Sequence, residues 1–110
     1  MTVQSFLELT DTMTPGEVDP ILRLRWLNEI EGRVRVELLG EDPAGLPEIN
    51  RETSPGTVLV VPSPYDRLYW LHHLAMCNCL AGDSVRYENA AAMFNETYAS
   101  FGRWLKRREA

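Results

Sequence analysis

The stretch SVRYENAAAMFNETYASFGRWLKRR at residues 84–108 decides the fold class of this chain. Its apolar side chains recur at alternating intervals of four and three residues, which places them on one side of an α-helix. They are Tyr87, Ala91, Phe94, Tyr98, Phe101 and Leu105. A helix of this length would be roughly 37 Å long at about 1.5 Å per residue, and such a seam packs against another helix. Residues 84–108 therefore predict a long helix in a helical bundle.

The partner for this helix is predicted directly upstream of it. Residues 63–81 begin with a helix-start signal, in which Ser63 is the cap, a proline lies in the first turn and an acid follows at the third position. The apolar residues after it leave almost no polar face, which is typical of a central, buried helix. The turn at residues 82–84 is short, with its glycine ending one helix and Asp83 or Ser84 capping the next. The two helices should therefore form an antiparallel hairpin.

Two further helices are predicted in the first half of the chain. Residues 2–13 have the apolar spacing of a short amphipathic helix, and residues 20–39 form a longer one that Gly40 ends. Asp19 is the preferred cap of this second helix, because the competing start at residues 14–17 would place a proline inside the helix. The chain should therefore be an all-α protein, a small helical bundle of about four helices.

Charged side chains occupy one face of the helix predicted at residues 20–39. Acids and bases lie four positions apart there, as in ion-pair ladders on exposed helices, so we expect a solvated face. The pairs are Arg25–Glu29, Glu29–Arg33, Glu31–Arg35 and Arg33–Glu37. Residues 33–38 also alternate between charged and apolar side chains, as a half-buried strand would. Helix and strand are therefore both open for this segment, with helix favoured.

A long connection over residues 41–64 separates the two pairs of helices. It contains five of the seven prolines, which prevents regular structure over most of its length. Residues 57–61, TVLVV, are typical of a short extended segment. Such a segment must pair with something, either another part of the same chain or a neighbouring subunit. Val58 and Val60 are therefore predicted as partner-binding residues.

The composition describes one globular domain over residues 1–110. Hydrophobic residues make up 45% and charged residues 25%, which are ordinary values for a folded protein. The net charge of −5 argues against a protein that holds nucleic acid by its phosphates. Two cysteines are too few for a disulfide framework and indicate a reducing compartment. Because no apolar run approaches the length of a membrane span and no signal peptide is evident, we expect a soluble protein that does not bind membranes.

The one cluster of metal-ligand residue types consists of His72, His73, Cys77 and Cys79. His73 and Cys77 share a helical face, but Cys77 and Cys79 point about 200° apart and cannot bind one ion together. A cysteine–histidine nucleophile pair would also need a pocket, an orienting group and an oxyanion donor, which the sequence does not indicate. Phosphate-binding loops and serine-nucleophile motifs are absent from the sequence. We therefore predict no catalytic, cofactor-binding or metal-binding residue and a protein that is not an enzyme.

The end of the long helix carries four basic residues, Arg103, Lys106, Arg107 and Arg108. Cations at a helix C-terminus complement the helix dipole, and they can also bind a partner. Residues 1–55 contain 11 acids and 5 bases, whereas residues 56–110 contain 5 acids and 6 bases, so the acidity belongs to the first half. We predict the four basic residues as partner-binding residues, together with Val58 and Val60.

Aromatic residues recur at helical spacings, and core packing is the favoured interpretation, but so small a domain cannot easily bury all of them alone. Surplus aromatic side chains are typical of subunit interfaces. They are Tyr65, Tyr69, Trp70, Tyr87, Phe94, Tyr98, Phe101 and Trp104. We therefore expect the protein to self-associate.

A series of short motifs runs in order along the chain. It comprises Leu24-Arg25-Trp26-Leu27-Asn28-Glu29-Ile30-Glu31-Gly32, Pro62-Ser63-Pro64-Tyr65-Asp66-Arg67-Leu68-Tyr69, Ala75, Gly82-Asp83, Arg86-Tyr87-Glu88-Asn89, Met93-Phe94-Asn95, Tyr98, Phe101 and Trp104. Over residues 3–105 this series resembles the head-tail connector (head-completion or adaptor) proteins of tailed bacteriophages and Gram-positive prophages. The chain departs from the family's pattern at His72-His73 and at Cys77 and Cys79, where other members tend to be aliphatic or aromatic.

The resemblance implies a non-enzymatic structural protein that joins the capsid portal to the tail and forms part of the DNA conduit as a ring subunit. It also favours helix over strand at residues 33–38. The implied partners are portal and tail-completion proteins and further copies of the chain, with no sequence-specific nucleic-acid binding and no cofactor. The implied location is the host bacterial cytoplasm during assembly and then the head-tail junction of the virion.

Three other functions stay open. One is a generic helical protein-binding adaptor or regulator with the same fold. Another is a DNA-binding regulator, which would need a recognition helix rich in bases, unlike the mixed charge of residues 20–39. The last is a metal or thiol enzyme that would use Cys77 or His73.

Overall fold

The computed structural model describes residues 1–109 and contains four α-helices. α1 spans Val3–Met13, α2 spans Pro20–Glu37, α3 spans Arg67–Leu80 and α4 spans Ser84–Glu109, with one short 3-10 turn, η1, at Pro43–Gly45. Over these described residues the chain forms no strand, and no helix is long and apolar enough to cross a membrane. The prediction of an all-α bundle of four helices, with a long loop between the second and third, is confirmed.

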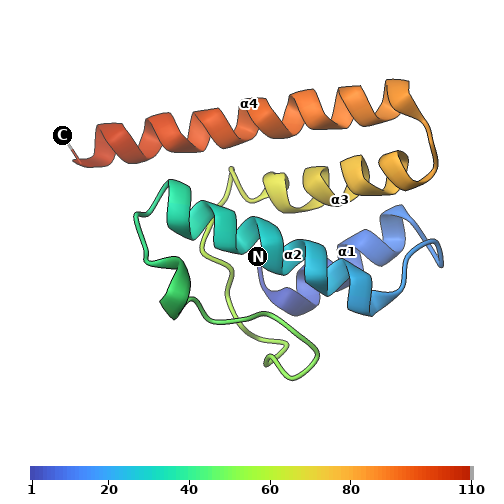
Figure 1. The fold of residues 1–110 in the computed structure, drawn as a ribbon, viewed down its shortest axis with the longest axis horizontal. Coiled ribbons are helices and arrows are strands. Elements are labelled where there is room, and N and C mark those ends of the chain that lie inside the picture. The colour runs from blue at the N-terminus through green and yellow to red at the C-terminus, as the bar shows by residue number, and fades with distance from the viewer. Residues whose placement is uncertain (110) are drawn as a thin grey trace.

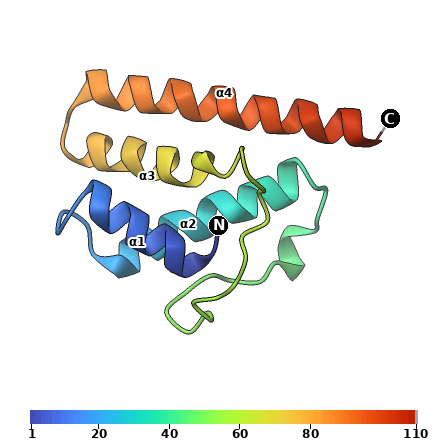
Figure 2. The ribbon, with the colours of Figure 1, turned by 180° about the vertical axis from the view of Figure 1, so that it is seen from behind.

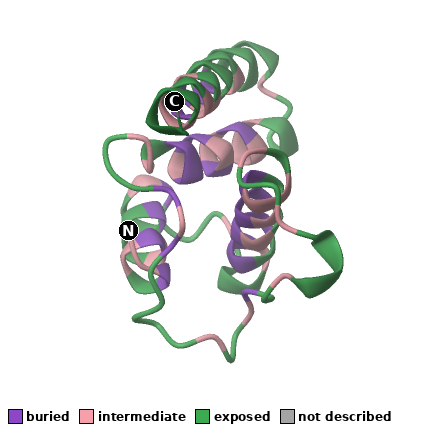
Figure 3. Cartoon of the chain, turned by 90° about the vertical axis from the view of Figure 1, so that its left-hand side faces the viewer, coloured by how far each residue is buried: buried purple, intermediate pink, exposed green. Residues whose placement is uncertain are grey.

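The helices form three layers, with α3 in the middle. α4 runs antiparallel to α3 along one side of it, and α1 and α2 lie on the opposite side (Figure 1). The same layers appear from behind (Figure 2). The end-on view places α1 and α2 on either side below α3, with most buried residues where these three helices face one another (Figure 3). The predicted central position of α3 and its antiparallel hairpin with α4 are confirmed.

Local side-chain signals set most of the helix ends. Asp19 caps α2, because its Oδ1 accepts a hydrogen bond of 2.7 Å from the amide of Ile21. Asp83 caps α4 in the same way, accepting from the amide of Arg86 at 3.1 Å. Gly82 has a φ of +73°, a left-handed conformation that lets the chain leave α3 and turn into α4. The preferred start of α2 and the tight turn of the hairpin are therefore confirmed.

Residues 33–38, for which the sequence left helix and strand both open, belong to the end of α2. α2 continues through Glu37, two residues short of the predicted end at Leu39, and Leu38 is its C-cap. Val34 is completely buried and Leu38 packs against the core one turn later. The helical spacing decides the conformation here because it brings both side chains to the same packed face.

The start of α3 differs from the prediction. The helix begins at Arg67, and Asp66 occupies the N-cap position without a side-chain cap bond. Residues 62–65 form a tight turn, in which the amide of Tyr65 donates to the carbonyl of Pro62 at 2.9 Å. The predicted Ser63 cap is wrong because the serine–proline signal serves this turn, through which the chain passes from the extended segment into the helix.

The extended segment at residues 57–61 pairs with the N-terminus of its own chain. The amide of Leu59 donates to the carbonyl of Met1 at 2.9 Å, and the amide of Val3 donates to the carbonyl of Thr57 at 3.0 Å. Thr2 and Val58 lie opposite each other in an antiparallel bridge. The sequence left open whether this segment pairs with its own chain or with a neighbouring subunit. In the structure it pairs with residues 1–3 of its own chain.

Most of the aromatic residues expected at subunit interfaces are used inside the domain. Of the eight, only Tyr87 is exposed, and the others are buried or half-buried. Three of the eight are buried and four are half-buried against the core, because α3 has two packed faces, so core packing accounts for most of this aromatic surface. Self-association stays a prediction that needs a different basis.

Candidate functional site

The last turns of α4 form a basic surface, which we call the basic helix end: Arg103, Lys106, Arg107 and Arg108. All four side chains are exposed, and within residues 1–109 none of them forms an ion pair with a carboxylate. The guanidinium carbon of Arg108 lies 5.3 Å from the centre of the Trp104 ring. This end of α4 extends beyond the other helices (Figure 1). The four residues therefore form one accessible cationic surface.

The two predicted valines lie apart from the basic helix end. Val58 is 70% exposed and pairs with Thr2 at the N-terminus, which lies well away from the C-terminal end of α4 (Figure 2). Val60 is half-buried, packs against the core and donates its amide hydrogen to Oε2 of Glu31 at 2.9 Å. Val58 is thus free for a partner, whereas Val60 belongs to the packing of its own chain.

The charged ladder predicted along α2 is mostly not formed. Only Arg33 and Glu37 make their predicted pair, with Nε 2.9 Å from Oε1. Arg25 and Glu29 are exposed and have no ion pair within residues 1–109. Glu31 is only 5% exposed, so the prediction of a solvated face is wrong there. The burial of Glu31 could have been predicted from the sequence, because Glu31 lies four residues after Leu27 and three before Val34, which are both buried.

A groove with a volume of about 870 Å³ lies between α2 and the loop at residues 48–52. The amide of Ile49 donates to Oδ1 of Asn28 at 2.8 Å, which holds the loop to the helix. The charged side chains around the groove are Asp19, Arg25, Glu29, Glu48, Arg51 and Glu52. We call this surface the acidic groove. Sequence reasoning missed it because its two walls come from segments far apart in the chain.

A buried carboxylate fastens the extended segment to the helices. Oε1 of Glu31 accepts a hydrogen bond of 2.5 Å from the hydroxyl of Tyr69 in α3, and Oε2 accepts from the amide of Val60. The same hydroxyl accepts from the amide of Val61 at 2.9 Å. Burial, with Glu31 beside it, raises the pKa of Tyr69, so the phenol stays protonated and donates. The network is structural and lies away from the exposed surfaces.

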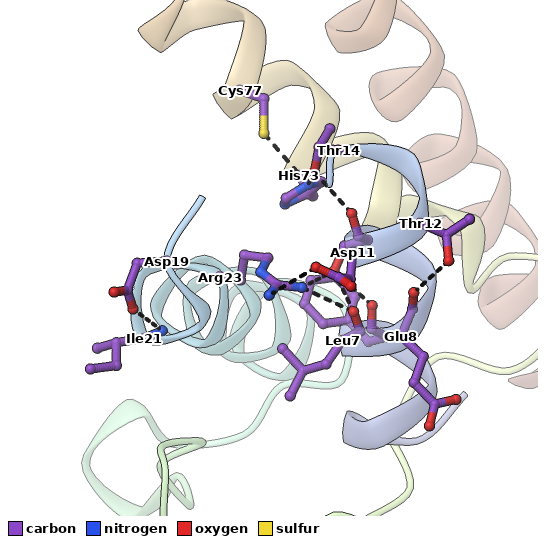
Figure 4. A network of polar contacts seen from close by, with 12 residues as sticks. Leu7, Glu8, Asp11, Thr12, Thr14, Asp19, Ile21, Arg23, His73 and Cys77 are labelled. Atoms are coloured by element: carbon purple, nitrogen blue, oxygen red, sulfur yellow. Dashed lines mark hydrogen bonds and ion pairs between the residues drawn. The ribbon is translucent and has the colours of Figure 1, made fainter. Parts of the chain in front are cut away.

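A second polar network joins α1, α2 and α3 (Figure 4). Arg23 is 6% exposed and donates to the carbonyl of Leu7 at 2.9 Å and to the hydroxyl of Thr10 at 3.1 Å. His73 is completely buried, with Nε2 2.9 Å from Oγ1 of Thr14. Burial first, and then the positive charge of Arg23, lowers the pKa of His73 to about 4. The imidazole is therefore neutral at physiological pH.

The geometry brings the predicted pair of His73 and Cys77 together, with Sγ 3.5 Å from Nε2. The hydroxyl of Thr14 donates to the carbonyl of Thr10 at 2.9 Å, so it has only its lone pairs to offer to His73. We therefore assign the imidazole proton to Nε2, the nitrogen that faces the thiol. Burial and the charge of Glu17 raise the pKa of Cys77. A protonated thiol facing an N–H group is not arranged as a nucleophile and its base.

Cys79 should react with iodoacetamide at least about tenfold faster than Cys77 near neutral pH. Cys79 is exposed, whereas Cys77 is half-buried with a raised pKa. Mass spectrometry of the labelled peptides measures both rates, with Cys79→Ser isolating the slower site. Equal rates, or faster labelling of Cys77, would contradict the geometry of this network.

Within residues 1–109, no group of three or more histidine, cysteine or acidic side chains is placed to hold a metal ion. Comparisons of the chain with protein-family models, curated proteins and solved structures give no significant match. The candidate site therefore consists of two exposed surfaces of opposite charge, the basic helix end and the acidic groove.

Proposed function

We propose that this chain is a non-enzymatic structural protein of a tailed bacteriophage or prophage. In this proposal it joins the capsid portal to the tail and forms part of the DNA conduit as a ring subunit, with portal and tail-completion proteins as its partners. It would act in the host bacterial cytoplasm during assembly and then at the head-tail junction of the virion.

The observation that carries the proposal is the place of the motifs that resemble connector proteins. Three of these motif residues form an aromatic cluster that fastens α4 to the turn before α3. The ring centres of Tyr65 and Phe101 are 5.5 Å apart, and those of Tyr65 and Trp104 are 5.9 Å apart. The motif residues therefore make the packing that orients the exposed end of α4, which supports a shared architecture with that family.

The charges also suit the proposed role. A net charge of −5 disfavours tight binding of DNA phosphates, so DNA could pass such a surface without adhering to it. The basic helix end is the place where a partner with an acidic surface would bind. A generic protein-binding adaptor is the alternative function, and it would use the same basic helix end without any portal or tail protein.

Replacing Arg103, Lys106, Arg107 and Arg108 together with alanine should block head-tail joining and leave the fold intact. The four side chains are exposed and unpaired within residues 1–109, so their loss removes a docking charge without opening the core. The measurement is the yield of infectious virions from a phage or induced prophage that encodes the variant. Arg86→Ala, which removes one exposed cation near the opposite end of α4, is the control for a loss of surface charge elsewhere on the helix.

Unchanged virion yield with the fourfold variant would remove the docking role from the basic helix end. Circular dichroism and thermal unfolding of the purified variant show whether the helical fold is retained. A portal-binding assay with the purified chain then separates the two functions, because a generic adaptor would not bind a portal ring.

A further inference from the structure

We propose that the basic helix end of one copy of this chain docks in the acidic groove of the next copy. The groove carries four carboxylates and two guanidinium groups, a net charge of −2. The helix end carries four cations in its last turns, with Glu109 as the one acid beside them. Opposite net charges of this kind attract and orient two surfaces as they meet. This contact deepens the ring-subunit part of the proposed function, on which it rests.

The charged side chains of both surfaces form no ion pair within the described part of one copy, although Asp19 also caps α2. The ion pairs of residues 1–109 involve neither the six charged side chains of the groove nor the four of the helix end. The predicted ion pair between Arg25 and Glu29, which would have used two charges of the groove, does not form within residues 1–109. The groove and the helix end therefore both keep their charges for an external partner.

The two surfaces cannot meet within one molecule. The acidic groove lies along the N-terminal half of α2, from Asp19 to Glu29. The end of α4 lies by the other end of α2, where a Cβ atom built on Gly102 would be 3.5 Å from the side chain of Leu38. α2 has 18 residues and is therefore about 27 Å long at about 1.5 Å per residue. Figure 1 shows the C-terminal end of α4 pointing away from this half of α2.

The groove also offers apolar surface for the stems of long cationic side chains. Ile21 is 53% exposed at its edge, and Leu24 and Ile49 lie buried against it. Arginine and lysine can lay their methylene groups on such a surface while their charged ends reach carboxylates. A volume of about 870 Å³ accommodates several side chains rather than a whole helix. The side chains that would enter are therefore those of the last turn of α4.

The proposed contact joins two different surfaces, so it is heterologous. Each copy keeps one free helix end and one free groove after binding a neighbour. A contact of this type closes into a ring when the rotation between copies allows it and otherwise extends into a filament. It should weaken with salt, because all of the charged groups involved are exposed.

Reversing the charge at two acidic positions of the groove should abolish self-association of the purified full chain. We expect the wild-type mass to rise with protein concentration at low salt, as measured by sedimentation and light scattering. Glu48→Lys/Glu52→Lys should raise the dissociation constant at least about tenfold, because like charges then face each other. Glu88→Lys/Glu96→Lys makes the same change of charge at exposed positions of α4 outside the groove, and should associate like the wild type.

Mixing two complementary variants tests that the contact is head-to-tail. Alanine at Arg103, Lys106, Arg107 and Arg108 keeps an intact groove, and Glu48→Lys/Glu52→Lys keeps an intact helix end. The neutral helix end of the first variant has no attraction to the basic groove of the second, so only one contact can form. Each variant alone should be monomeric, and an equal mixture should form a dimer that grows no further. A symmetric interface would not give this result, because it would need the same surface on both copies.

Three results would overturn the contact. They are a wild-type chain that stays monomeric at millimolar concentration and low salt, association that survives the groove reversal, and a variant mixture that does not form dimers. None of these results decides portal binding, which the portal-binding assay tests with Glu48→Lys/Glu52→Lys, a variant that lacks the contact between copies and keeps the basic helix end. Failure of this contact and failure of the proposed function are therefore separate outcomes.

Discussion

Replacing Tyr69 with phenylalanine should lower the free energy of unfolding by about 3 kcal/mol. The hydroxyl of Tyr69 donates to the buried carboxylate of Glu31 at 2.5 Å and accepts from the amide of Val61 at 2.9 Å. Phenylalanine fills the same space but leaves a buried carboxylate with one donor fewer and a backbone amide without an acceptor. Urea unfolding measures this loss, which is a large part of the stability of a domain of this size.

The matched control for this substitution is Tyr87→Phe. Tyr87 is 39% exposed, and its hydroxyl takes part in none of the hydrogen bonds found within residues 1–109. Its loss should therefore change the free energy of unfolding by less than about 0.5 kcal/mol. Hydrogen exchange adds a local readout, because Tyr69→Phe should also speed exchange at the amides of Val60 and Val61. Equal effects of the two substitutions would show that the buried hydroxyl network does not hold the extended segment.

The free energy of unfolding should fall by about 2 to 3 kcal/mol as the pH is lowered from about 6.5 to about 4. The pKa of His73 is lowered from 6.5 to about 4 in the folded chain. Between these values the unfolded chain binds a proton at His73 and the folded chain does not, so acid favours unfolding. The stability contributed by neutral His73 is therefore complete above pH 6.5 and is lost progressively below it.

The variants His73→Gln and His72→Gln test which group causes this pH dependence. His73→Gln should flatten the curve of unfolding free energy against pH, even if it lowers stability at every pH. His72→Gln should leave most of the slope, although burial also lowers the pKa of His72. NMR titration of the imidazole signals gives a direct check. A His73 midpoint near 6.5, or a flat stability curve in the wild type, would contradict a buried neutral imidazole.

Glu37 responds at lower pH and can be separated from His73. Hydrogen bonds from Tyr98 first, and then from Arg33, hold the pKa of Glu37 below its ordinary value of 4.5. The stability from this carboxylate is present above that ordinary value and is lost only as the pH falls further. The loss of stability between pH 6.5 and 4.5 should therefore belong to the histidines.

The helices were predictable because helix formation depends on neighbours in the sequence. The Asp19 cap, the turn at residues 82–84 and the seam of α4 are signals within a few residues of each other, and all three appear in the structure, except that Tyr87 at the start of the seam is exposed. The Ser63 prediction failed although its signal is local. The same serine–proline pair suits a turn or a helix start, and the path of the preceding segment chose between them.

The candidate site was only half predictable. The basic helix end was found from the sequence, since its four cations lie within six residues of one another. The acidic groove was not found, because Glu29 and Glu48 become neighbours only when the loop folds back onto α2. The aromatic side chains suggested a subunit interface, whereas most of them pack inside the domain. A count of aromatic residues does not show how many faces of a helix will be buried.

The sequence by itself determined that this protein is a bundle of four helices, where most of the helices begin and end, and which end of α4 is basic. Only the tertiary structure decided which charges are buried and which are free. Glu31 and Glu29 are both acids on α2, yet Glu31 is enclosed by Tyr69 and Val60 and Glu29 faces the groove. The physical reason is that helical spacing is set by residues three or four positions apart. The environment of a charge is set instead by segments that arrive from elsewhere in the chain.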